Sequence, residues 1–184
     1  MPRSPSALDA GPTAVSAANQ AAPPPLLAEQ AAMVRKETIA NTIASVVIAA
    51  MLTWLIFHGR PAIPALDSPP GGIFGIFPGT FNFTLLVTIA LTLIVRKRVN
   101  TALVARRVAV TQLPTNVLLR GLVLALAATT LMAPTGLALV YMGIHAGLLP
   151  ALWSLYGMMG FFVSYFALLS VLITPVIVRR ALSD

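Results

Sequence analysis

Four apolar segments, each about as long as a membrane-spanning helix, dominate the chain. They cover about residues 38–57, 78–95, 116–142 and 151–178, and basic residues lie near their ends. An α-helix rises about 1.5 Å per residue, so roughly 20 apolar residues cross the ~30 Å hydrocarbon core of a bilayer. The pattern therefore predicts an all-α membrane protein, with four transmembrane helices in one domain over residues 33–184.

The start of the second helix follows from its length. From Phe81 to Val95 there are 15 residues, about 22 Å of helix, which is too short to span the hydrocarbon core. Starting at Pro78 gives 18 residues, and proline fits the first helical turn because its missing N–H has no acceptor there. We therefore place the helix start at Pro78, with GGIFGIF (71–77) before it at the membrane interface.

Composition agrees with lipid as the solvent of this chain. Of the 184 residues, 58% are hydrophobic and 9% are charged, which is more apolar surface than a soluble domain of this size can bury. The net charge of +7 comes from basic residues at the segment ends. They do not form a basic face with interleaved aromatics, so nucleic-acid binding is not expected. The chain has no cysteine, which excludes disulfides and thiolate chemistry.

The basic residues also predict the orientation. Of the 12 Lys and Arg residues, only Arg60 falls in a loop on the other side of the predicted membrane from the rest. Cytoplasmic loops carry the excess of Lys and Arg, so both termini and the central loop are predicted to be cytoplasmic. Aromatic residues gather at the opposite boundary, as interfacial rings do; these are Trp54, Tyr141, Trp153 and Tyr156.

Residues 1–32 predict a disordered cytoplasmic tail. The segment is rich in alanine and proline and cannot bury enough apolar surface to fold. It has no apolar run of the kind that a signal peptide contains. Met33, which opens MVRKETIAN, is a candidate for the true translation start.

A weak internal repeat relates the two halves. NTIASVVIAAML and NVLLRGLVLALA each begin with asparagine, at Asn41 and Asn116, and LIVRKR and VIVRR close the two halves. Both halves have the same predicted orientation. We therefore predict two helical hairpins arranged as a parallel repeat, unlike the inverted repeats common in transporters.

Candidate catalytic chemistry is sparse. No acidic residue lies inside a predicted span, and the five acids do not pair into a site; they are Asp9, Glu29, Glu37, Asp67 and Asp184. Coupled transport usually needs an intramembrane acid, and acid–base catalysis needs paired groups. No enzymatic activity is predicted.

His58 and His145 are the only histidines, and both are predicted at the outer ends of helices. Two imidazoles on separate helices can flank a haem or share a metal ion. The alternative is that they are ordinary interfacial residues, and the sequence favours it because no neighbouring group can be named that would orient the rings. We predict no cofactor, and a haem or metal protein at the outer face is the third functional hypothesis.

Small residues follow one face of the fourth segment, at spacings of three or four; they are Gly157, Gly160, Ser164, Ala167 and Ser170. Such stripes let helix backbones approach closely in lipid. They predict packing within the chain or docking onto a second chain. Our leading hypothesis is a membrane protein without enzymatic activity that acts by helix association, either as an accessory or assembly subunit or as a homo-oligomer.

The alternative hypothesis is a small permease for a neutral or apolar solute. It requires a polar or hydrated cavity lined by Asn82, Thr84, Thr88 and Thr129. Thr84, Thr88 and Thr92 also step along one face of the second segment. Their hydroxyls can instead bond to carbonyls one turn back, in which case they need no ligand.

The segments RKETIAN, FPGTFNF, IVRKR and TPVIVRRAL together resemble small four-helix inner-membrane proteins of Gram-negative bacteria. The resemblance covers roughly residues 33–184 and rests mainly on topology marks. It implies a multi-pass protein of the bacterial inner membrane, and it implies no activity. The expected partners are the lipid bilayer and either another membrane protein or a second copy of the chain.

The predicted topology can be tested with single-cysteine variants, because the chain has no native cysteine. We expect Arg60→Cys to react with a membrane-impermeant thiol reagent added outside intact cells. Arg98→Cys should react only after the membrane is opened. Labelling of both positions from the same side would contradict the topology.

Overall fold

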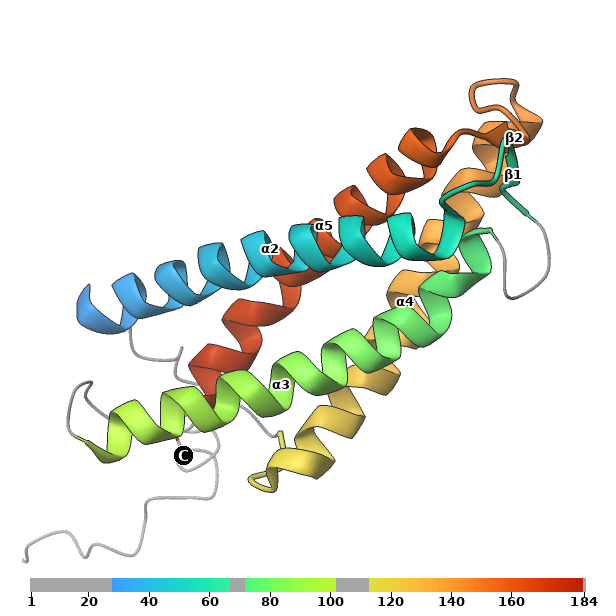
Figure 1. Ribbon diagram of the computed structural model, residues 1–184. Coiled ribbons are helices and arrows are strands. Elements are labelled where there is room, and N and C mark those ends of the chain that lie inside the picture. Colours follow the sequence, from blue (N-terminus) through green and yellow to red (C-terminus); the bar gives the residue numbers. More distant parts are fainter. Residues whose placement is uncertain (1–27, 67–71, 102–112, 184) are drawn as a thin grey trace, which may run out of the picture.

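The computed structural model describes residues 28–66, 72–101 and 113–183, and these form four long helices and a small sheet (Figure 1). The elements in chain order are α2 (Ala28–Phe57), β1 (Ile63–Pro64), the 3-10 turn η1 (Ile73–Gly75), α3 (Ile76–Asn100), α4 (Val117–His145), β2 (Leu152–Trp153) and α5 (Leu155–Ala181). All four α-helices are long and apolar enough to cross a membrane. The prediction of a mainly helical protein with four membrane-length helices is confirmed.

Helix α2 extends beyond its predicted start. It begins at Ala28 instead of residue 38, so residues 28–32, expected in the disordered tail, are helical. The basic residues Arg35 and Lys36 indicate where the helix leaves the hydrocarbon core. Charged residues do not terminate a helix, however, when the residues before them are stabilised by packing. Here Met33 and Val34 are buried against the end of α5. The remainder of the predicted tail, residues 1–27, lies outside the described residues.

Helix α3 also begins before its predicted start. Its first residue is Ile76, two before Pro78, and η1 precedes it directly. Proline is tolerated at this position because the first four N–H groups of a helix have no partner within the helix. The GGIFGIF segment is therefore not a purely interfacial loop. Ile73 and Ile76 are fully buried.

The starts of α4 and α5 are fixed by caps. Asn116 accepts hydrogen bonds from the N–H groups of Leu118 and Leu119, and Ser154 accepts one from that of Gly157. Such bonds satisfy donors that the first turn leaves open. The cap at Ser154 places the start of α5 four residues after the predicted position 151, and β2 occupies part of the interval.

A two-stranded sheet, which was not predicted from the sequence, joins two of the connections between helices. β1 and β2 are antiparallel, with Ile63 opposite Trp153 and Pro64 opposite Leu152, and the N–H of Ala65 donates to the carbonyl of Ala151 at 2.9 Å. Two-residue strands are too short to produce an alternating pattern in a sequence. The sheet joins the α2–α3 connection to the α4–α5 connection. We call this end of the bundle the sheet end.

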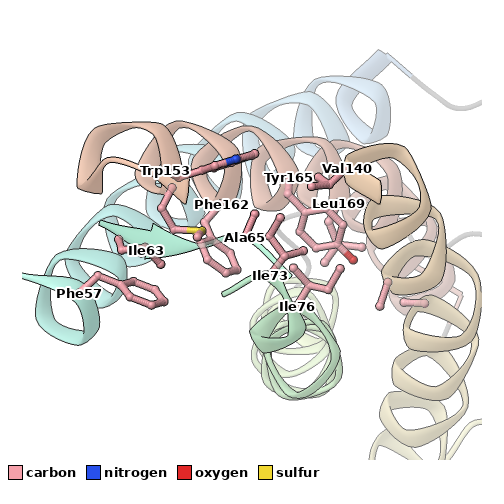
Figure 2. Close-up of a cluster of buried hydrophobic side chains, with 13 residues drawn as sticks. Phe57, Ile63, Ala65, Ile73, Ile76, Val140, Trp153, Phe162, Tyr165 and Leu169 are labelled. Atoms are coloured by element: carbon pink, nitrogen blue, oxygen red, sulfur yellow. The ribbon is translucent and has the colours of Figure 1, made fainter. Parts of the chain in front are cut away.

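The helices pair across the two predicted hairpins. Helix α2 packs along α5, and α3 packs against both α4 and α5. Each helix therefore finds its main neighbour in the other hairpin, and the predicted parallel repeat stays a prediction. Figure 2 shows the larger core cluster, which lies toward the sheet end and includes Phe57, Ile76, Phe162, Tyr165 and Leu169.

Basic residues lie in the turns where α2 and α4 begin and α3 and α5 end. These four helix termini are at the same end of the bundle (Figure 1). We call this the basic end. Arg98 of α3 donates to Glu37 of α2 at 2.6 Å. Arg180 donates to the carbonyl of Leu113 at 2.9 Å. These contacts connect α2 to α3, and α5 to the segment that precedes α4.

Arg120, one turn into α4, is fully buried. Its Nε donates to the carbonyl of Pro114 at 2.9 Å, and Nη2 lies 3.4 Å from the carbonyl of Thr115. The side chain folds back over the turn that precedes its own helix. A buried guanidinium needs such acceptors because arginine stays positively charged in proteins and cannot become neutral on burial.

Polar side chains fasten α2 to α5 within the membrane-spanning part. Asn41 Nδ2 donates to Ser170 Oγ at 2.6 Å and to Thr174 Oγ1 at 2.8 Å. Ser170 and Thr174 are fully buried. Because the hydrocarbon core contains no water, the side-chain amide of Asn41 would have unsatisfied hydrogen-bond donors without these partners.

Replacement of Asn41 by leucine tests this contact. We expect Asn41→Leu to lower the free energy of unfolding by about 1 kcal/mol, the scale of hydrogen bonds between membrane helices. Thermal unfolding in detergent measures the change. Asn82→Leu is the matched control, because Asn82 is exposed on α3 and should tolerate the same substitution. Equal destabilisation by both substitutions would contradict the assignment.

Candidate functional site

An apolar groove runs between α2 and α3. It consists of two adjoining cavities of about 330 and 280 Å³, which share five lining residues, namely Ala49, Leu52, Gly79, Asn82 and Phe166. The groove forms because α2 and α3 both pack on α5 but pack only weakly on each other. We call it the α2–α3 groove.

Small residues form much of its two walls. Ala44 and Ala49 contribute from α2, Gly75 from the end of η1 and Gly79 from α3. At Gly79 a Cβ atom would lie 2.9 Å from the ring of Phe166, closer than carbon atoms can pack. Glycine at this position therefore lets α3 approach the aromatic side chains of α5.

The floor of the groove is aromatic. Phe162 and Phe166 of α5 are one helical turn apart and stack with ring centroids 6.3 Å apart. Phe83 of α3 packs on Phe166 at 5.4 Å. Polar groups are few: Asn82 lies in both cavities, Asn41 and Ser45 line one of them, and Thr53 lines the other. The arrangement suits an apolar occupant at membrane depth.

The predicted small-residue stripe of α5 divides into two parts. Ser170 is buried, where it accepts the hydrogen bond from Asn41, and Ala167 is half-buried. Gly157, Gly160 and Ser164 are exposed, and a Cβ atom at Gly160 would have no neighbour within 4 Å. The inner part of the stripe thus packs within the chain, whereas the part nearer the sheet end faces outward.

The two histidines are exposed and bonded to their own helices. His58 Nδ1 lies 3.1 Å from the carbonyl of Trp54, and its ring stacks on that indole with centroids 4.7 Å apart. His145 Nδ1 lies 2.9 Å from the carbonyl of Tyr141. Among the described residues no group of three or more potential ligands could hold a metal ion. Within the described residues, the hydrogen bonds and ring contacts of each imidazole go to its own helix.

Of the residues required for the permease hypothesis, only Asn82 lines the α2–α3 groove. Thr84 and Thr88 are fully buried in the bundle, whereas Asn82 is exposed and lines the α2–α3 groove. Thr88 donates to the carbonyl of Thr84 at 2.7 Å, as predicted. The same prediction is wrong for Thr84 and Thr92, whose buried hydroxyls have no hydrogen-bond partner within the described residues.

Comparison with known protein families, curated proteins and solved structures gives no match. The interpretation of the site therefore rests on its geometry. Reasoning from sequence missed the α2–α3 groove. Gly72, Gly75 and Gly79, three or four residues apart, were the available signal, but the pattern does not say which helix they face.

Two glycines distinguish packed from open helix surface. A Cβ atom at Gly136 of α4 would lie 3.0 Å from the ring of Tyr165, whereas Gly160 has open space. We expect Gly136→Leu to destabilise the protein by about 1–3 kcal/mol, because the core must shift. Gly160→Leu should leave the midpoint of thermal unfolding in detergent nearly unchanged. A large loss of stability at Gly160 would show that this surface is covered within the monomer.

Proposed function

We propose that this protein is a multi-pass membrane protein without enzymatic activity that acts by helix association, as an accessory or assembly subunit or as a homo-oligomer. The observation that carries the proposal is the α2–α3 groove, an apolar surface with small residues on both walls. The exposed part of the α5 stripe offers a second surface of the same character.

The physics of association in lipid supports a helix as the occupant. Lipid chains are as apolar as leucine, so helices associate through close packing and not through exclusion of water. Ala44 and Ala49 line the groove from α2, and Gly75 of η1 and Gly79 of α3 line it from the other side. Side chains of an incoming helix can enter between these walls and contact the rings of the floor.

A permease for a neutral or apolar solute is the alternative function. One observation favours it: the hydroxyls of Thr84, Thr92 and Thr129 are buried and have no hydrogen-bond partner among the described residues. A polar solute passing between α3 and α4 could bond to them. Neither cavity of the α2–α3 groove is lined by any of these threonines, so helix association has the stronger geometric support.

The proposed location is the bacterial inner membrane, with the basic end in the cytoplasm. Supporting this orientation, Arg35, Lys36, Arg96, Lys97, Arg98, Arg179 and Arg180 all belong to the helix termini at that end. Lysine and arginine are retained on the cytoplasmic side during insertion. The termini of the chain would then both be cytoplasmic.

Blocking the groove tests the proposal. Ala44 is exposed and lines the groove, so Ala44→Trp should fill the space without disturbing the core. We expect this variant to lose most of the association that the wild-type protein shows. Chemical crosslinking in native membranes, followed by gentle solubilisation and mass spectrometry of the co-purified chains, measures it.

Val47→Trp is the matched control, because Val47 is 60% exposed and lies on the same helix outside the lining of the groove. It should retain wild-type association. A wild-type protein recovered only as an uncrosslinked monomer would refute helix association. Equal loss in both tryptophan variants would refute the groove as the association surface.

A further inference from the structure

A third cavity, of about 390 Å³, lies between the first turns of α2 and the last turns of α5 at the basic end. Arg35 of α2 and Arg179 of α5 are exposed and line it. Val34 is buried, and Pro175 is half-buried. It shares no lining residue with the two cavities of the α2–α3 groove.

The two arginines bring uncompensated positive charge to one place. Neither guanidinium forms an ion pair or hydrogen bond within the described residues. The acid nearest to Arg35 along α2, Glu37, is paired with Arg98 of α3 at 2.6 Å. An arginine presents a planar set of donors that matches the oxygens of a phosphate group. Two such groups on one cavity are complementary to an anionic phosphate ligand.

The remainder of the cavity is apolar. Ile39 and Pro175 provide hydrocarbon surface on the membrane side of the two arginines, and Val34 adds apolar surface beside Arg35. The hydroxyl of Thr38 already donates to the carbonyl of Val34 at 2.8 Å. The arginines are therefore the charged donors of the cavity, and below them lies surface that suits an acyl chain.

We propose that the cavity binds an anionic phospholipid. Its phosphate lies between Arg35 and Arg179, and one acyl chain runs over Ile39 and Pro175 toward the bilayer centre. Basic pockets between transmembrane helices bind anionic headgroups in this way. The bound lipid bridges α2 and α5 beside the cluster in which Met33 and Val34 pack on Ile177 and Val178. This site is independent of the helix-association proposal, which concerns the other face of α2.

Native mass spectrometry of the full chain in detergent, with added phosphatidylglycerol or phosphatidylcholine, tests the site. We expect phosphatidylglycerol to be retained in preference to phosphatidylcholine. The double variant Arg35→Gln/Arg179→Gln should weaken phosphatidylglycerol binding about tenfold or more, because two charge contacts are lost. Arg35→Lys/Arg179→Lys should keep the preference for the anionic lipid. An unchanged thermal unfolding midpoint would show that each variant is folded.

The matched control removes two charges from the same end but outside the cavity. Lys36 and Lys97 are exposed and do not line it, so Lys36→Gln/Lys97→Gln should bind phosphatidylglycerol like the wild type. Equal weakening by this control would overturn the site in favour of diffuse attraction to the basic end. Displacement of the lipid by excess inorganic phosphate would overturn the assignment to a lipid. Equal retention of phosphatidylcholine would remove the role of charge.

Discussion

The pairing of α2 with α5 is the contact on which the other features of the bundle depend. Asn41 supplies two hydrogen bonds across it, and apolar clusters support it toward both ends. In lipid, helices gain no hydrophobic free energy by meeting, so specific polar bonds and close contacts decide which helices pair. Because α5 also packs on α3, it holds α2 and α3 at a distance from each other. The α2–α3 groove is the result.

Charge has two roles at the basic end. Exposed arginines and lysines predict which side of the membrane this end faces. Arg120 and Arg180, in contrast, are buried and bond to carbonyls that precede α4. They secure the return of the chain into the membrane. A count of positive charges in the sequence does not distinguish exposed from buried basic residues. The contacts in the structure show that Arg120 and Arg180 stabilise the fold.

The sequence was sufficient to predict the number and type of the main elements, because an apolar run of about 20 residues has few stable alternatives in a bilayer. Asn116 was correctly placed at the start of a helix. The start of α2 at Ala28 was not predictable, since burial of Met33 and Val34 depends on the distant residues Ile177 and Val178. The pairing of the helices was also not predictable, because a stripe of small residues indicates a surface for close packing but does not identify the helix that packs there.

For the same reason, the candidate site was predicted only in part. The stripe from Gly157 to Ser170 was found from its spacing, but the point where α2 ceases to cover it depends on the direction in which the two helices cross. The α2–α3 groove arises from three helices at once. No local pattern encodes it, although Asn82 and Gly79 were visible as individual residues.

The antiparallel match of β1 with β2 has a consequence for biosynthesis. The two strands are separated by α3 and α4 in the chain, and the main neighbour of α2 is α5. During translation, α2 therefore enters the bilayer long before either its helical partner or its strand partner has been made. Until α5 emerges from the ribosome, Asn41 lacks the hydroxyls of Ser170 and Thr174 to which it donates in the finished bundle. The β1–β2 sheet and the α2–α5 contact can therefore form only after the last quarter of the chain has been made.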